Sequence, residues 1–320
     1  MKRQRTILLI LLGCALIVIG IGVSANLSQA TTEQAASSTA VTAVDSAAKS
    51  SKAAAKTQKQ VLAQAQEAAE KASTKATGTA ATITEELTAK WQTLLADQDS
   101  RVDIAVYLPT TKQIIHLTND ASQGTFATAS IVKVSILAQV LHEMAQKGTT
   151  LSSTQQNQAV EMIENSSNDA ATYFLLNVLG SYGALNQIFA DLNMPSSQVN
   201  QTAWGITQTT ATDQLKLLNA IFYEGTYLTS TSQAYLRELM GQVSAEQNWG
   251  VSSGSASWEL KNGWLTDEGN TMINSIGHVT TDSGFDYTIA ILTDQNESEA
   301  SGEALVSQLA AVTSEVLDQQ

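Results

Sequence analysis

Cysteine is almost missing from this 320-residue sequence: the one cysteine, Cys14, lies in an apolar run near the start. Disulfides and zinc–thiolate sites are therefore excluded from the rest of the chain. The three histidines, His116, His142 and His278, lack metal-ligand spacing, and no HExxH motif occurs. We interpret each as a surface or packing residue, and expect no metal and no other cofactor.

Basic residues are scarce after residue 80. Residues 1–80 carry nine Lys or Arg and four Asp or Glu, whereas residues 81–320 carry eight and 26. So acidic a body argues against nucleic acid as a partner. Each of the eight basic residues in this acidic part therefore needs a structural or functional explanation.

The first 25 residues differ in kind from the rest. Lys2, Arg3 and Arg5 precede an unbroken apolar run from Ile7 to Val23. This pattern predicts a signal peptide or a retained signal anchor over residues 1–25. In both alternatives the positive flank stays inside, and the rest is exported to the outer face of the cell membrane or secreted, near the cell wall.

Aromatic residues are absent from residues 26–80, which are nearly all Ala, Thr, Ser, Gln, Lys and Glu. Such a composition cannot bury a core. We interpret the segment as an Ala/Thr/Lys-rich stalk that is disordered or partly helical.

Residues 81–320 contain the periodic patterns of one folded domain, which we expect to be a monomer. Strand patterns lie near both ends of this part, and helical patterns lie between them. The expected strands are 102–108, 112–118, 271–281 and 285–294, and the expected helical stretches are 83–97, 130–146, 154–192, 209–241 and 299–317. This order predicts an α+β fold in which an antiparallel sheet, built from both chain ends, receives an inserted helical lobe.

The stretch TASIVK (128–133) stands where a helix begins, so Ser130 has a plain interpretation as a helix cap. A capping pattern favours Glu or Gln three residues later, but Lys133 stands there, with the unfavourable charge for a first helical turn. One turn of helix brings Lys133 within reach of the Ser130 hydroxyl. A nucleophile and its base are therefore the alternative.

Two further triplets allow both a plain and a functional interpretation. Ser166-Ser167-Asn168 is a helix cap or turn, or a hydroxyl and an amide facing a cleft. Lys261-Asn262-Gly263 contains a turn-like Asn-Gly pair, but residues 266–270 are the better turn. Lys261 and Trp264 should then lie on a strand, with Gly263 allowing a close approach to its backbone.

A competing motif is Gly250-Val251-Ser252-Ser253-Gly254, which matches the G-x-S-x-G elbow of α/β-hydrolases. That elbow needs a strand before it and a helix after it, whereas here it lies in a Gly/Ser-rich loop that leads to a strand. The one histidine after it, His278, falls inside an expected strand. We therefore reject the elbow.

With SIVK (130–133), SSN (166–168) and KNG (261–263) in order, residues 83–320 resemble the class A β-lactamase and penicillin-binding serine hydrolases. Their marks are S-x-x-K, S-x-N and K-[ST]-G. The flank MIENSSNDAATYFLL (162–176) resembles the family's segment M-I-x-x-S-D-N-x-A-A-x-x-L-L. The flanks QNWGVSSG (247–254), LKNGWL (260–265) and INSIG (273–277) resemble the subgroup called class A β-lactamase-related serine hydrolases.

The resemblance implies a β-lactamase/transpeptidase-like fold and a role for each matching residue. Ser130 would be the nucleophile, Lys133 its base, and Ser166 the relay of the proton to the leaving nitrogen. Asn168 would bind the substrate amide, and Lys261 would attract the carboxylate of a D-Ala-D-Ala-like peptide or a β-lactam. The remaining matches belong to the substrate-binding strand: Asn262, Gly263 and Trp264, the last with its N–H beside that of Ser130 in an oxyanion hole.

Two departures from the family pattern bear on function. Asn262 replaces the Thr or Ser whose hydroxyl helps to bind the substrate carboxylate. The loop that carries the deacylating Glu in class A β-lactamases corresponds to residues 194–210 here, which contain no Glu or Asp. Acylation is expected, and slow or no deacylation.

We therefore expect an exported serine hydrolase that β-lactams or peptidoglycan peptides acylate at Ser130. One alternative is an active β-lactamase with an unusual deacylating group. The other is a catalytically weak module that binds the cell wall.

Overall fold

The computed structural model describes residues 82–320. The expected signal segment (1–25) and stalk (26–80) lie outside the described residues. Within the described residues, no helix combines the length and apolar character that a membrane crossing requires.

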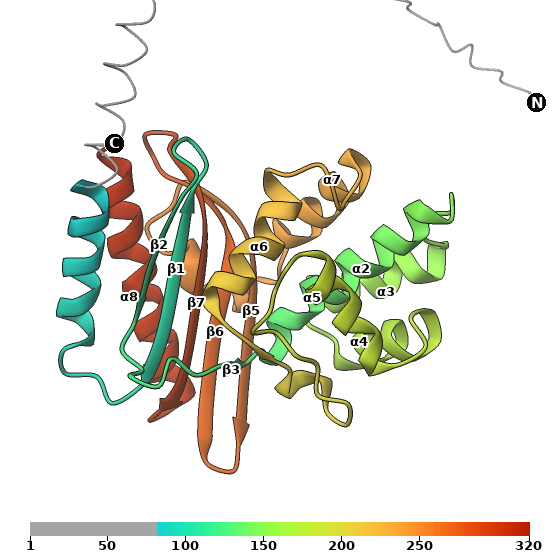
Figure 1. The fold of residues 1–320 in the computed structure, drawn as a ribbon, viewed down its shortest axis with the longest axis horizontal. Helices are drawn as coiled ribbons and strands as arrows, with labels where there is room; N and C mark the ends of the chain where they lie inside the picture. Colours follow the sequence, from blue (N-terminus) through green and yellow to red (C-terminus); the bar gives the residue numbers. More distant parts are fainter. Residues whose placement is uncertain (1–81) are drawn as a thin grey trace, which may run out of the picture. The chain divides into compact units, whose positions relative to one another are not determined.

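A five-stranded antiparallel sheet forms the centre of the domain, in the order β2-β1-β7-β6-β5 (Figure 1). Near-continuous burial along β1, β6 and β7 fits a sheet whose two faces are both covered. β1 pairs with β7, so that Ile104 lies opposite Ile291 and the two ends of the domain meet. This confirms the expected sheet. The strands are β1 (Arg101–Leu108), β2 (Gln113–Thr118), β5 (Ser257–Asp267), β6 (Asn270–Thr280) and β7 (Asp286–Asn296).

Two helices cover one face of the sheet, as Figure 1 shows: residues 82–95 and α8 (Glu299–Asp318). Trp91 is completely buried there, and its indole N–H donates to Thr313 Oγ1 at 2.9 Å. Leu87 and Leu95 share this buried face, as the periodicity of the stretch predicts.

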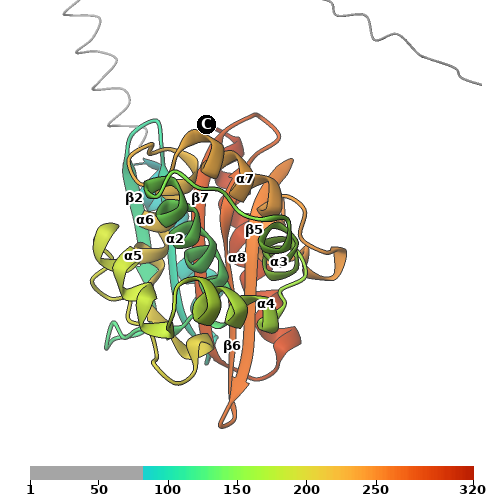
Figure 2. The ribbon, with the colours of Figure 1, turned by 90° about the vertical axis from the view of Figure 1, so that its right-hand side faces the viewer.

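The helical lobe lies on the other face, inserted between β3 (Phe126–Ala127) and β5, and faces the viewer in Figure 2. Its central helix, α2 (Val132–Gln146), packs against α3, α5 and α7, while α6 packs on β1 and β7. Two short strands, β3 and β4 (Gln208–Thr209), pair beside the lobe. The other helices are α3 (Ser153–Ile163), α4 (Asn168–Tyr173), α5 (Asn186–Asp191), α6 (Ala211–Phe222) and α7 (Ser230–Met240).

Short 3₁₀ and π turns interrupt the lobe where the sequence suggests only long helical stretches. The turn η1 (Ala129–Ile131) precedes α2, and η4 (Trp204–Ile206) lies on the loop before β4. A π-helical segment, η2 (Phe174–Val178), follows α4 directly. The others are η3 (Tyr182–Leu185), η5 (Ala245–Gln247) and η6 (Gly250–Ser252).

Candidate active site

Ser130 lies in η1, immediately before α2. The preceding residue, Ala129, has a φ of 46°, in the left-handed region that non-glycine residues seldom adopt. The N-cap of α2 is Ile131, and no side chain caps the helix. The plain interpretation of Ser130 as a helix cap is therefore wrong. Its hydroxyl is half-buried and lies 2.8 Å from the amine of Lys133.

The Lys133 side chain is completely buried, with its Nζ atom among oxygen atoms of three residues. Besides Ser130 Oγ, these are the Ser166 carbonyl oxygen at 2.6 Å and Asn168 Oδ1 at 2.8 Å. Burial disfavours the charged form and lowers the pKa of Lys133 to about 7. A neutral Lys133 donates two protons to the Ser166 carbonyl and Asn168, which leaves its lone pair for the Ser130 proton, as a general base requires.

Two serines of the SSN triplet have separate roles: Ser167 caps a helix, whereas Ser166 lies at the site. The Ser167 hydroxyl accepts from the Ala170 N–H at 3.2 Å and caps α4, which confirms the plain interpretation for this residue. Ser166 instead has a φ of 57° and lies with its hydroxyl between two lysines. Its Oγ atom is 3.1 Å from Lys133 Nζ and 3.0 Å from Lys261 Nζ.

Lys261 lies on β5, as expected, and is completely buried. Its Nζ contacts Ser166 Oγ, Gln247 Oε1 at 3.2 Å and the Asn262 carbonyl oxygen at 3.1 Å. Burial and the nearby charge of Lys133 lower the pKa of Lys261 well below its usual value. Among the described residues, neither lysine forms an ion pair with a carboxylate.

The other predicted substrate-binding residues lie farther along β5. A Cβ atom added to Gly263 would come within 2.7 Å of the Ser130 backbone nitrogen, which confirms the expected close approach at this glycine. The Asn262 amide points toward the segment 247–249 and donates to the carbonyls of Gln247 and Trp249. The Trp264 ring packs edge-on against Trp249, with centroids 6.2 Å apart. The oxyanion hole itself stays a prediction.

Two residues near Ser130 were not singled out by the sequence patterns. Asn274 is completely buried on β6, and its amide donates to the carbonyls of Ala127 at 2.8 Å and Thr128 at 3.0 Å, so it holds the segment before Ser130. Trp204, on η4, places its ring 5.3 Å from Lys133 Nζ. In the sequence, their only signals are a polar residue inside an expected strand, for Asn274, and a tryptophan in a polar loop, for Trp204.

The loop 194–210 packs against η1 through η4 and brings no carboxylate to the site. The Thr128 N–H donates to the Thr207 carbonyl at 2.8 Å, which ties this loop to the nucleophile turn. The Trp204 indole N–H donates to Thr172 Oγ1 at 3.2 Å, which fixes its orientation. Lys133 therefore has an aromatic ring on its loop side.

The rejected elbow lies elsewhere. Gly250–Ser252 form the turn η6, with no strand before it, and β5 follows instead of a helix. His278 lies within β6, as expected, and its Nδ1 is 2.8 Å from Glu259 Oε2. Its polar side-chain partners are the carboxylates of Glu259 and Asp286, not a serine.

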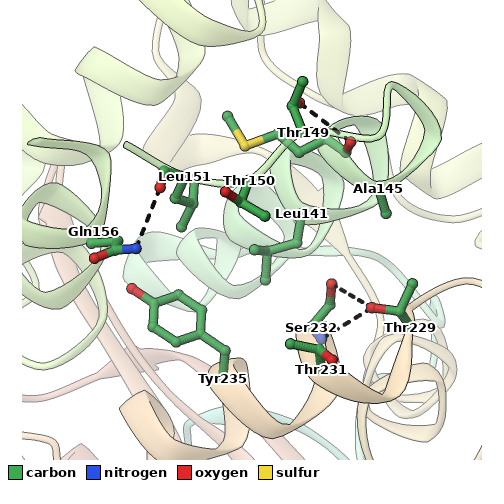
Figure 3. Close-up of a pocket in the computed structure, with 11 residues that line it drawn as sticks. Leu141, Ala145, Thr149, Thr150, Leu151, Gln156, Thr229, Thr231, Ser232 and Tyr235 are labelled. Carbon is green, nitrogen blue, oxygen red and sulfur yellow. Dashed lines mark hydrogen bonds between the residues drawn. The ribbon is translucent and has the colours of Figure 1, made fainter. Parts of the chain in front are cut away.

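A separate cavity of about 490 Å³ lies away from the lysines, between α2 and α7 (Figure 3). Leu141, Leu151 and the ring of Tyr235 form much of its apolar wall. None of the predicted site residues lines it.

Comparison with known proteins identifies a family and a fold. The model of the beta-lactamase enzyme family matches residues 153–317, about half of the chain, including SSN and KNG. No curated protein matches the chain. A class A beta-lactamase from Bacteroides cellulosilyticus DSM 14838 is 17% identical, with a TM-score of 0.65 over 74% of this chain and 99% of that chain.

Two further solved structures share the fold. PBP-A is 18% identical, with a TM-score of 0.63 over 73% of this chain and 96% of its own. A PBP-A mutant, solved as an acyl-enzyme complex with penicillin G, is also 18% identical, with a TM-score of 0.63 over 74% and 97% of the two chains. These matches confirm the predicted fold.

Proposed function

The chain belongs to the beta-lactamase enzyme family and is a serine hydrolase, and from that premise we propose that it transfers acyl groups through Ser130. The acyl donors would be β-lactams or peptides that end in D-amino acids. One observation carries the proposal: Lys133 is completely buried, has no carboxylate partner among the described residues, and lies 2.8 Å from Ser130 Oγ.

In the proposed acylation, the neutral Lys133 amine takes the proton of Ser130 as its oxygen attacks the substrate carbonyl. The backbone N–H groups of Ser130 and Trp264 would stabilise the oxyanion, the former with help from the start of α2. Ser166 touches both lysines, so it can pass a proton to the leaving atom and regain one from Lys133. The acyl–oxygen bond to Ser130 forms, and the bond to the leaving atom breaks.

We propose further that the Ser130 ester is long-lived. Its hydrolysis needs a base for the attacking water, and the loop 194–210 has no carboxylate to supply one. The Trp204 ring, which has no basic group, lies beside Lys133 instead. The acyl-enzyme complex of the PBP-A mutant with penicillin G supports β-lactams as a donor class.

The proposed site of action is outside the cell membrane, near the cell wall. Residues 1–25 carry the pattern of a signal peptide or signal anchor, and residues 26–80 that of a stalk. Peptidoglycan peptides would then be the physiological donors.

Mass spectrometry of the intact full-length protein, incubated with penicillin G, tests the proposal. A persistent adduct that is missing in Ser130→Ala is the expected result. Hydrolysis of the penicillin without an adduct would favour an active β-lactamase. Absence of both adduct and hydrolysis, with penicillin still bound, would favour a binding module and refute acyl transfer from penicillins.

A further inference from the structure

The basic groups of the described part are almost all committed to partners within the protein. Lys112 lies on the exposed turn before β2, at the opposite sheet edge from β5. The Arg237 guanidinium donates to the carbonyls of Ile221 and Phe222. The other four basic residues outside the site all contact carboxylates: Lys90 with Glu315, Arg101 with Asp120 and Asp294, Lys147 with Glu143, and Lys216 with Asp213.

Only Lys261 and Lys133 remain to meet a negatively charged substrate, and Lys261 has no proton to offer. Even when fully protonated, the Lys261 amine carries only three protons, and three acceptors surround its Nζ: Ser166 Oγ, Gln247 Oε1 and the Asn262 carbonyl. The side chain is completely buried. An incoming carboxylate would have to displace one of these buried hydrogen bonds.

Asn262 cannot compensate with its amide. Both N–H groups of the amide are engaged, one with the Gln247 carbonyl at 2.8 Å and one with the Trp249 carbonyl at 3.0 Å. The remaining polar atom, Oδ1, is buried and has no hydrogen-bond partner. Oδ1 is an acceptor without a proton, so the Asn262 side chain has no donor left for a carboxylate.

The next residue on the same face of β5 is Trp264, two positions along the strand. Its side chain is among the few large apolar groups that are exposed in the described residues, at 37%. Its ring packs against that of Trp249, whose backbone carbonyl the Asn262 amide holds. Beside the lysines, β5 and the segment packed on it therefore present the indole rings of Trp264 and Trp249 and no free cation.

We propose that the site prefers acyl donors with an uncharged leaving group, meaning esters and amides without a free carboxylate on that side. A carboxylate placed there would lose water without gaining the charged or doubly hydrogen-bonded partners that a buried anion needs. This inference rests on the proposed acyl transfer at Ser130. Donors with a carboxylate, penicillins included, still acylate Ser130 but do so more slowly than a neutral donor with the same acyl group.

A matched pair of esters tests this preference with the full-length protein. The acyl part is N-acetyl-D-alanine in both, and the leaving groups are 3-hydroxybenzamide and 3-hydroxybenzoate, which differ in charge. Release of the phenol gives kcat/KM, divided by the rate of hydroxide hydrolysis of each ester to remove intrinsic reactivity. Intact mass with Ser130→Ala assigns the adduct to Ser130.

The amide-bearing ester should have the higher corrected kcat/KM, by about tenfold, the effect of one poorly paired buried charge. Asn262→Thr, which supplies a hydroxyl donor, should narrow that ratio. Equal rates for the two esters, or faster reaction of the carboxylate ester, would overturn the inference while acyl transfer stands. If neither ester nor penicillin G modifies Ser130, the proposed function fails and the inference with it.

Discussion

Arg101 and Lys133 are both basic groups set into the fold near the nucleophile turn, but their surroundings are opposite. Arg101 donates to the carboxylates of Asp294 and Asp120, each at 2.8 Å, and its guanidinium lies 4.4 Å from the Phe126 ring. The hydrogen bond to Asp294 raises the pKa of Arg101. Lys133 has no such anion, and its pKa is lowered to about 7.

The difference shows how one type of charge is put to two uses. The Arg101 guanidinium is always charged and is paired with two carboxylates, and it also donates to the Thr125 carbonyl and supports the segment that leads to Ser130. A buried lysine without a carboxylate becomes a neutral amine, which is a base but a poor structural charge. The missing anion is therefore the physical mark of the site.

The largest effect should follow removal of the unpaired amine. Lys133→Met leaves Ser130 without its base, so the rate of acylation should fall about 1,000-fold. Burst kinetics with penicillin G, followed by intact mass, measures it. Lys216→Met is the matched control, because Lys216 is partly exposed and paired with Asp213. A loss of less than about tenfold would mean that Lys133 is not the base.

Removal of the paired cation should act on stability instead. Arg101→Met leaves the buried carboxylate of Asp294 without its partner, and the free energy of unfolding should fall by about 3 kcal/mol. Urea unfolding measures the loss. The folded fraction should still be acylated at close to the wild-type rate, and a parallel loss of acylation would break the distinction between the two clusters.

Trp204→Glu supplies the anion that the lysines lack. The Trp204 ring centroid lies 5.3 Å from Lys133 Nζ, so a carboxylate in place of the ring should pair with Lys133 and activate water. We expect the Ser130 adduct to hydrolyse about 10- to 100-fold faster, as followed by recovery of the unmodified mass. Trp204→Gln is the control of the same shape without charge. Equal recovery in both variants would point to removal of the indole as the cause.

The sequence indicates Lys133 well because the helix pattern and the charge disagree at this position. A lysine three residues after Ser130, in the first turn of a helix, is unfavourable for the dipole, and this holds before any fold is known. The strands follow in the same way from runs of β-branched residues, and the turn at Glu268 and Gly269 has the positive φ angles that a tight hairpin needs.

Other parts of the site depend on contacts between distant segments. The direction of the Asn262 amide is set by the carbonyls of Gln247 and Trp249, which no local pattern places next to β5. Asn274 bonds to Ala127, 147 residues away. Trp204 reaches Lys133 from an irregular loop. Periodicity carries no information on such pairs. The sequence therefore shows that Asn262 replaces the family's Thr or Ser, but not that both of its amide N–H groups are engaged within the protein.

The pH dependence of stability offers a smaller but more direct view of the unpaired lysine. An unfolded lysine titrates near pH 10.4, whereas Lys133 in the fold titrates near 7. Between these values the unfolded chain binds one more proton, so stability rises with pH, by up to about 1.4 kcal/mol per pH unit. The unfolding free energy of the wild type minus that of Lys133→Met should therefore rise between pH 7 and pH 9. A constant difference would mean that Lys133 stays charged in the fold.

The smallest effect is expected for a third kind of basic residue, one paired in solvent. Lys90 and Glu315 join the helix 82–95 to α8 with their charged atoms 3.3 Å apart, but their side chains are 36% and 59% exposed. A double-mutant cycle with Lys90→Met and Glu315→Gln should give a coupling of about 0.5 kcal/mol, lowered further by salt. Trp91, which is completely buried on the same helix, is unchanged in all four proteins. The Lys90–Glu315 pair is in direct contact, as the Arg101 pairs are, but it is exposed. A coupling near 3 kcal/mol would therefore show that direct contact, and not burial, determines how much an ion pair stabilises this fold. A small coupling places the weight on burial, which is the property that Lys133 shares with Arg101's carboxylates and Lys90 lacks.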